Sequence, residues 1–121
     1  MVFLGAALVQ RLLVDELATE IVATVRSSVC GLPTGVERIV VGGIDEANDW
    51  RDALTGCEVV IHLAARVHVM QETTTNPLEE FRRVNVQGTL NLARQAAWKA
   101  LLLKRGFMQR IARGEHVTAE D

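Results

Sequence analysis

The chain has 121 residues, which is enough for one domain or part of one. Hydrophobic residues make up 49% and charged residues 23%, so the composition excludes intrinsic disorder, and the net charge of −2 indicates no partner class. No apolar run reaches the roughly 18 residues that a membrane-spanning helix needs, and the N-terminus lacks the basic segment of a signal peptide. We therefore expect a cytoplasmic protein that does not bind membranes.

The first half of the chain alternates between helix and strand signals. Residues Phe3 to Asp15 carry an apolar stripe at helical spacing, which predicts a helix. The β-branched runs Glu20 to Val25 and Val36 to Val41 predict two strands. Gly42 and Gly43 stop the second strand.

A further helix and strand are predicted in the middle of the chain. Asp45 to Leu54 is predicted to be a short helix, with Asp45 as its N-cap, Trp50 on its apolar side and Gly56 as its stop. Glu58 to Leu63 is an apolar, β-branched run that predicts a third strand.

A long helix is predicted after a loop from Arg66 to Asn76. Asn76 and Pro77 form a favourable helix start, with the proline at the first helical position. One stripe of this helix consists of Phe81, Asn85, Gly88, Leu92 and Ala96. A polar Asn85 in the middle of an apolar stripe is the clearest single-residue anomaly in the chain.

The C-terminal segment differs from the rest in charge. Residues 1–98 hold eight basic and twelve acidic side chains, whereas residues 99–114 hold five basic ones and no acid. Lys99 to Arg113 predicts a basic amphipathic helix, or a continuation of the helix before it. We favour a solvated helix that covers a core face; binding to an anionic surface or to nucleic acid is the less favoured alternative. We divide the chain into a domain at 1–98 and a helical tail at 99–121.

The two cysteines show no pattern of metal binding. Cys30 and Cys57 are isolated, with no second ligand at metal-like spacing. We expect two buried or half-buried thiols, with a disulfide or a metal site as the alternative. His62 and His68 are interpreted as packing histidines rather than catalysts.

The order of helix, strand, strand, helix, strand and helix predicts an α/β fold with a small parallel sheet. Four motifs lie along it: FLGAALV at 3–9, VRS at 25–27, VVIHLAA at 59–65 and NVQGT at 85–89. With these motifs the chain resembles the N-terminal NAD(P)-binding part of the extended short-chain dehydrogenase/reductase family. Within that family it is similar to the NAD-dependent epimerases and dehydratases of nucleotide sugars. The resemblance covers about residues 2–98 and implies a partial Rossmann-like, three-layer fold.

The resemblance also implies a site for NAD or NADP. Its residues would be Gly5, Arg26, Ser27, Ile44, Leu63, Ala64, Ala65 and Asn85. Gly5 matches the last glycine of the phosphate turn, where it would allow close packing of helix on strand. Arg26 would lie near the adenosine ribose and could bind a 2′-phosphate or stack on adenine. Four of these residues also have a purely structural interpretation: a helix start for Gly5, a solvated loop for Arg26, and packing for Ala64 and Ala65.

The chain departs from the family pattern in several places. The family's first strand and the earlier glycines of its phosphate turn are absent, and Val2 stands where the middle glycine is expected. Gly43 stands where the family usually has an aspartate that contacts adenine. The chain has no tyrosine, so it cannot supply the phenol of the family's Tyr-x-x-x-Lys pair. We therefore expect a chain truncated at both ends, with weak or lost NAD(P) binding, no catalytic or metal-binding residues and no independent catalysis.

The missing strand leads to two further hypotheses. In the family this strand lies centrally, so Glu58–Leu63 must pair directly with Glu20–Val25, or another chain must fill the gap. The chain could therefore be a non-enzymatic module for self-association or partner binding, which uses an exposed sheet edge and the basic C-terminal helix. Alternatively, a separate polypeptide could supply the missing strand and the Tyr/Lys pair. A nucleotide sugar is the partner that the intact family implies, and a homo-oligomer is the partner that the open edge implies.

Overall fold

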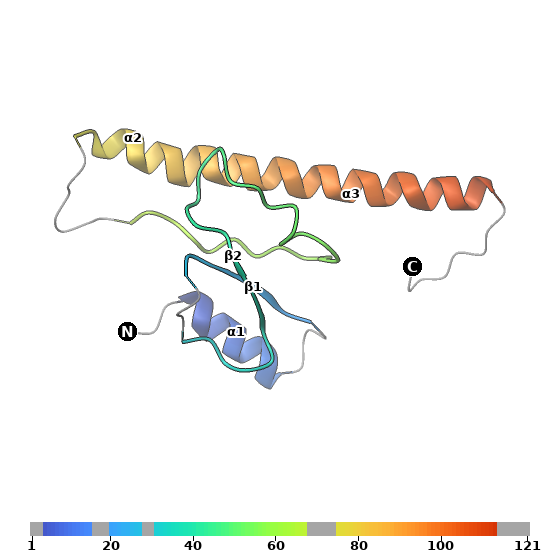
Figure 1. Ribbon diagram of the computed structural model, residues 1–121, viewed down its shortest axis with the longest axis horizontal. Coiled ribbons are helices and arrows are strands. Elements are labelled where there is room, and N and C mark those ends of the chain that lie inside the picture. Colours follow the sequence, from blue (N-terminus) through green and yellow to red (C-terminus); the bar gives the residue numbers. More distant parts are fainter. Residues whose placement is uncertain (1–3, 16–19, 28–30, 68–74, 114–121) are drawn as a thin grey trace.

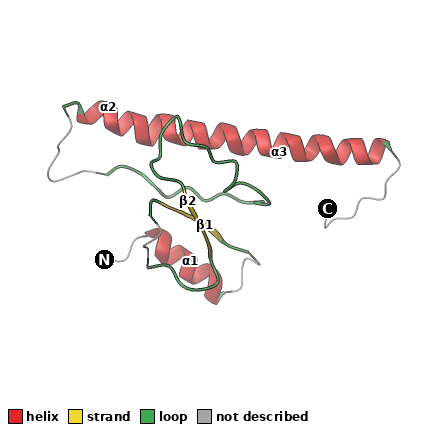
Figure 2. Ribbon diagram, viewed as in Figure 1, coloured by secondary structure: helices red, strands yellow, loops and turns green. Residues whose placement is uncertain are grey.

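The computed structural model describes residues 4–15, 20–27, 31–67 and 75–113. In chain order its elements are α1 (Leu4–Val14), β1 (Val22–Val25), β2 (Glu37–Val40), α2 (Pro77–Arg82), the π-helical segment η1 (Arg83–Gly88) and α3 (Thr89–Ala112). The two strands form a parallel sheet, and most of the chain between β2 and α2 is loop (Figure 2). The molecule is therefore a small α/β fold, consistent with part of a Rossmann-like arrangement.

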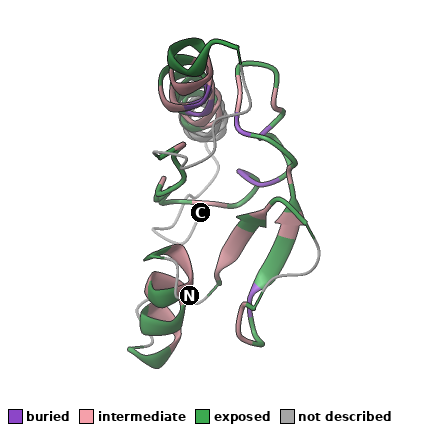
Figure 3. Cartoon of the chain, turned by 90° about the vertical axis from the view of Figure 1, so that its left-hand side faces the viewer, coloured by how far each residue is buried: buried purple, intermediate pink, exposed green. Residues whose placement is uncertain are grey.

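The helical second half forms one long rod. Figure 1 shows α2, η1 and α3 joined end to end, and Figure 3 shows α1 and both strands together on one side of that rod. The described segment after β2, residues 41–67, passes between these two parts (Figure 1). Its packing against the rod therefore decides how the sheet is held.

The sheet confirms the first two predicted strands. β1 and β2 pair in parallel with Val22 opposite Glu37 and Val25 opposite Val40. The ladder extends beyond the strands, because the N–H of Val41 donates to the carbonyl of Val25 at 3.0 Å. The carboxyl ends of both strands therefore meet at the same edge of the sheet.

The predicted helices at the two ends of the chain are confirmed. α1 covers the expected segment, although none of its residues is buried. The long helix begins at Pro77, and the Asn76 side chain caps it by accepting a hydrogen bond from the Glu79 N–H at 3.2 Å. The expected tail helix is a continuation of α3, which runs without a break to Ala112. The division of the chain at residue 98 stays a prediction.

The core lies between the rod and the loop that follows β2. Its buried members are Ile44, Trp50, Ala53, Leu54, Val84 and Leu92. Figure 3 shows buried backbone on the rod and on the loop beside it, and none on α1. Of the predicted stripe, Gly88 and Leu92 are buried, and Ala96 packs against the cluster.

The predicted helix at Asp45–Leu54 is wrong. This segment forms a series of turns in which the Asp45 carboxylate accepts from the Ala47 N–H at 2.9 Å and the Asp49 carboxylate from the Arg51 N–H at 3.0 Å. Such short-range bonds compete with the helical ladder. The apolar side of the segment was nevertheless correctly identified, because Trp50 is buried.

The predicted strand at Glu58–Leu63 is also wrong. The segment belongs to no sheet in the described part of the chain, and its apolar residues are exposed, with Val59 at 75% and Ile61 at 53%. A strand needs a neighbour for its backbone hydrogen bonds. β1 pairs only with β2, so the segment has no described strand beside it.

The backbone of η1 approaches the loop after β2 closely at Gly88. A Cβ placed on Gly88 would lie 2.8 Å from Ile44 Cγ2, 3.2 Å from the Ile44 carbonyl carbon and 3.3 Å from the Asp45 nitrogen. Two of these atoms belong to the backbone and cannot turn away. Glycine is therefore required here for close approach of two chain segments.

We predict that Gly88→Ala destabilises the protein by about 1–3 kcal/mol, because the loop must shift to admit a methyl group. The gain in helix propensity, up to about 1 kcal/mol, is smaller than this cost. Gly5→Ala is the matched control, since nothing lies within 4 Å of its Cβ position. Urea unfolding measures both. Equal unfolding midpoints for the two variants would show that the approach at Gly88 is not constrained.

Candidate functional site

Two predicted cofactor residues lie at the carboxyl end of β1. Arg26 and Ser27 follow directly after the strand, and both are exposed. The adjoining end of β2 leads through Gly42 and Gly43 to Ile44. In parallel α/β sheets, ligands bind beyond the carboxyl ends of the strands. These positions are therefore at the expected edge.

Ile44 contributes its side chain to the core rather than to an open surface. It is 8% exposed and lies against Gly88 of η1. Any contact of this position with a ligand would therefore use its backbone.

Asn85 is fixed to the backbone of the segment after the predicted third strand. The Arg66 N–H donates to Asn85 Oδ1 at 2.7 Å, and Asn85 Nδ2 donates to the Arg66 carbonyl at 2.8 Å. The Arg66 guanidinium carbon also lies 5.6 Å from the centre of the Phe81 ring. This explains the polar residue on the apolar stripe, because its amide holds a loop in place with both of its polar atoms.

A second contact between this segment and the rod lies one helical turn further on. His62 Nε2 is 3.1 Å from Thr89 Oγ1, and both residues are half-buried. The sequence interpretation of His62 as a packing residue did not identify Thr89 as its partner. The signal was present, because Asn85 and Thr89 are four residues apart and so lie on one face of a helix.

The contacts of His62 and Arg66 with the rod lie on either side of Leu63, Ala64 and Ala65. All three are exposed, and the flanking residues His62 and Arg66 are held against the rod. The structure thus places the loop segment at 63–65 beside Asn85, and Gly88 of the same helical segment lies against Ile44.

Gly5 is not packed as the sequence suggested. It lies in the first turn of α1, half-buried, and no described atom lies within 4 Å of where its Cβ would be. The expected close packing of helix on strand is therefore not seen at Gly5. Val2, Cys30 and His68 lie outside the described residues.

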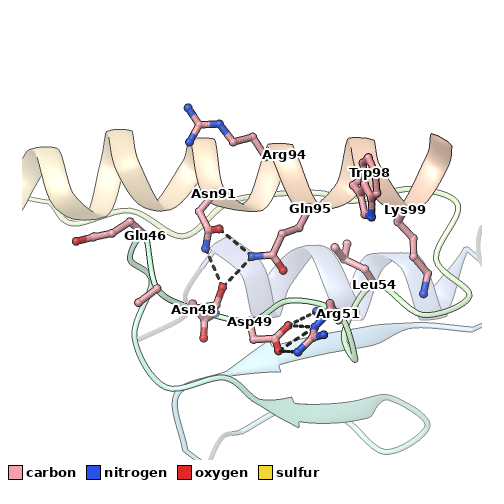
Figure 4. Close-up of a pocket in the computed structure, with 11 residues that line it drawn as sticks. Glu46, Asn48, Asp49, Arg51, Leu54, Asn91, Arg94, Gln95, Trp98 and Lys99 are labelled. Carbon is pink, nitrogen blue, oxygen red and sulfur yellow. Dashed lines mark hydrogen bonds and ion pairs between the residues drawn. The ribbon is translucent and has the colours of Figure 1, made fainter. Parts of the chain in front are cut away.

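A cavity of about 650 Å³ lies elsewhere, between the turns at 46–54 and α3 (Figure 4). Its polar side chains largely serve the fold. Asn91 Nδ2 and Gln95 Nε2 donate to the backbone carbonyl of Asn48 at 2.8 and 2.9 Å. The backbone N–H of Trp50 donates to Gln95 Oε1 at 2.8 Å. Figure 4 shows Arg94 pointing away from the loop. We therefore interpret this cavity as a gap at the edge of the contact that holds the turns at 46–54 against α3.

An ion pair stands at the rim of that cavity. Three side-chain contacts join Arg51 to Asp49: Nε donates to Oδ1 at 2.9 Å and to Oδ2 at 3.0 Å, and Nη2 donates to Oδ2 at 2.6 Å. The Arg51 side chain, helped by its backbone N–H, lowers the pKa of the Asp49 carboxyl from 3.8 to about 2. Both side chains are exposed, so their attraction is screened by solvent and salt.

Among the described residues, no three His, Cys, Asp or Glu side chains lie close enough together to bind a metal ion. In the same part of the chain no helix combines the length and apolar character needed to cross a bilayer. Cys57 is a free, half-buried thiol whose sulfur donates to the Ala53 carbonyl at 3.2 Å.

Comparison with known proteins agrees with the motifs. Residues 2–105 match the model of the NAD dependent epimerase/dehydratase family. A UDP-glucose 4-epimerase from Vibrio cholerae is 46% identical over 56 residues, which are 46% of this chain and 17% of that protein. The alignment thus spans well under two thirds of the relative. Among solved structures, none matches the chain significantly.

We predict that Asn85→Ala loosens the loop segment at 63–66 and lowers stability by about 1–3 kcal/mol, since it removes the side chain that pairs with the Arg66 backbone. Hydrogen exchange at the Arg66 amide should become faster. Gln87→Ala, an exposed neighbour in the same helical segment, should leave this exchange unchanged. Unaltered exchange at Arg66 in Asn85→Ala would contradict the role of Asn85 in holding the Arg66 backbone.

We predict that the Asp49 carboxyl titrates near pH 2 in the folded protein and near its usual value after Arg51→Gln. Because the folded pKa is depressed, the pair stabilises the fold above the unfolded pKa of 3.8 and loses this effect as the pH falls through about 2. Carbon-detected NMR titration of the carboxyl measures it. Arg82→Gln is the control, and an unmodified chain titrating near 3.8 would refute the pairing.

Proposed function

Because the chain belongs to the NAD dependent epimerase/dehydratase family, we propose that it is a partial NAD(P)-binding domain of the nucleotide-sugar epimerase type. It binds NAD or NADP weakly and does not catalyse a reaction by itself. The observation that supports this proposal is the exposed loop segment at 63–65, held on both sides by the His62–Thr89 and Arg66–Asn85 contacts. An exposed segment that contains Ala64 and Ala65 and is held in this way offers a surface on which a flat cofactor can lie.

The described residues fit part of a dinucleotide. The exposed Arg26 guanidinium suits a phosphate or the face of adenine. Exposed Ala64 and Ala65 permit close approach because their side chains are small. Asn85 acts through Arg66 as a positioning residue rather than as a direct ligand, since both polar atoms of its amide are engaged.

The bound cofactor would supply a hydride acceptor for oxidation of a sugar hydroxyl. The chain's own residues would bind and orient it: Arg26 would hold a phosphate or the face of adenine, and the segment at 63–65 would offer a contact surface. The family's phenol general acid/base has no counterpart, because the chain contains no tyrosine. We therefore propose binding without turnover, and catalysis only if another polypeptide supplies the Tyr/Lys pair and the nucleotide-sugar site.

A second candidate function is self-association in the cytoplasm. The exposed apolar residues Val59, Val60, Ile61 and Leu63 favour it, with 75%, 45%, 53% and 42% of their surface accessible. Contiguous exposed apolar segments mark interaction surfaces. The basic tail helix could add to such a contact, whereas we do not propose a nucleic acid or membrane partner.

We predict saturable but weak binding when the purified chain is titrated with NAD+ and NADP+ by calorimetry. Thermal unfolding in parallel should rise, since a ligand at 100 times its Kd adds roughly 2.7 kcal/mol. Arg26→Ala should weaken binding about tenfold, the size expected for a lost charge-assisted hydrogen bond. Arg82→Ala, an exposed arginine on α2, is the control.

No heat and no shift in unfolding up to millimolar dinucleotide would overturn the first candidate. Equal weakening by Arg26→Ala and Arg82→Ala would show instead that binding is a general charge effect.

A further inference from the structure

A loop with two exposed glycines follows β2 at the edge of the sheet where Arg26 lies. The ladder pairs the last residues of β1 and β2, so Arg26 and the loop after β2 leave the sheet at the same edge. Gly42 has a positive φ of 70°, which glycine adopts without strain, and Gly43 is exposed beside it. The loop therefore presents backbone without side chains at the edge where the proposed cofactor would bind.

The Asp45 carboxylate lies beside this glycine backbone. Its Oδ2 is 3.7 Å from the position that a Cβ of Gly43 would occupy. The Asp45 side chain is 29% exposed, so a ligand that covers the glycines can also contact the carboxylate. The Ile44 side chain is buried in the core, which leaves the carboxylate and the backbone as the groups that residues 42–45 offer to a ligand.

Contacts with the rod and within the loop fix the Asp45 carboxylate. Arg83 Nη1 donates to Asp45 Oδ2 at 3.2 Å, and the Ala47 N–H donates to Asp45 Oδ1 at 2.9 Å. Arg83 is itself held by Glu80, to which its Nε donates at 3.1 Å and its Nη2 at 2.9 Å. The Asp45 backbone carbonyl accepts from Asn91 Nδ2 at 3.1 Å. The carboxylate is therefore held in place by the protein itself.

A carboxylate held in this way can still accept a further hydrogen bond. A carboxylate offers about four lone-pair positions, and the contacts with Arg83 and Ala47 use one on each oxygen of Asp45. A ligand group that donates a hydrogen bond and carries no negative charge suits it, whereas a phosphate would be repelled. The exocyclic amine of adenine is such a donor, and the flat ring that bears it fits against backbone without side chains.

We propose that Asp45 recognises the base of the bound dinucleotide, with its Oδ2 accepting a hydrogen bond from the exocyclic amine of adenine. Arg83 is a positioning residue, because it acts on the base through that oxygen. Arg26 then binds a phosphate or stacks on the ring from the end of β1. The inference rests on the proposed dinucleotide binding and names the residue that distinguishes adenine from other bases.

A dinucleotide with an altered base tests this contact. Nicotinamide hypoxanthine dinucleotide carries a carbonyl oxygen where NAD+ carries the amine, so it would place an acceptor against the carboxylate. We expect the chain to bind NAD+ about tenfold more tightly than this analogue, the size expected for a hydrogen bond to a charged group. NMR titration of the isotope-labelled chain measures both dissociation constants, because the method extends to weak binding.

Asp45→Asn should abolish or reverse this preference. The amide oxygen can keep the bond to the Ala47 N–H, so Nδ2 takes the place of Oδ2 and presents a donor instead of an acceptor. Glu46→Gln is the matched control, since it removes the same charge from the exposed neighbouring residue. Arg83→Gln should lower the preference and should have no further effect in the Asp45→Asn background. A purely structural role of Arg83 would weaken binding of both dinucleotides alike and leave the ratio of their dissociation constants unchanged.

Circular dichroism verifies that each variant is folded, and the comparison of Asp45→Asn with Glu46→Gln stands by itself if Arg83→Gln does not fold. Equal binding of both dinucleotides by the unaltered chain would overturn the role of Asp45 and leave the proposed dinucleotide binding intact. A preference that survives Asp45→Asn, or that Glu46→Gln also removes, would likewise overturn it. Binding of neither dinucleotide would overturn both proposals.

Discussion

The close approach of η1 to the backbone at Ile44 determines where the other parts of the molecule lie. Gly88 lacks a Cβ, so the loop after β2 can touch the rod directly. From this contact the amides of Asn91 and Gln95 continue along α3 and hold the Asn48 carbonyl. The buried cluster is enclosed between these backbone and amide contacts. Because the loop continues directly from β2, the sheet is positioned through the same contact.

The rod can serve two neighbours because adjacent stripes of its surface have different chemistry. Val84, Gly88 and Leu92 recur at intervals of four and face the core. One residue further along, Asn85 and Thr89 recur at the same interval and hold the segment at 62–66. The first half of this region is π-helical, a geometry often found at functional sites. A single helical rod therefore packs against the core and positions the loop segment at 62–66.

The parts of the fold that sequence patterns predicted are those whose hydrogen bonds are local or whose partner is the next element. α1, β1, β2 and the long helix with its Asn76 cap are of this kind. The helix expected at Asp45–Leu54 failed because aspartate side chains bind nearby backbone N–H groups instead. The strand expected at Glu58–Leu63 failed because a strand depends on a neighbour that its own sequence cannot supply. Asn85 was correctly identified as unusual, but its partner, the Arg66 backbone, is a tertiary contact that spacing alone does not reveal.

Burial is distributed unevenly, and this asymmetry explains where association would act. The rod side holds six buried core residues that pack together, whereas α1 holds none, and the apolar run at 59–63 faces solvent. The free energy gained by removing apolar surface from water is about 25 cal/mol per Å². The sheet side and the run at 59–63 have therefore gained less of this free energy than the rod side. If self-association occurs as proposed, covering the run at 59–63 would remove exposed apolar surface from water and so stabilise this side of the fold.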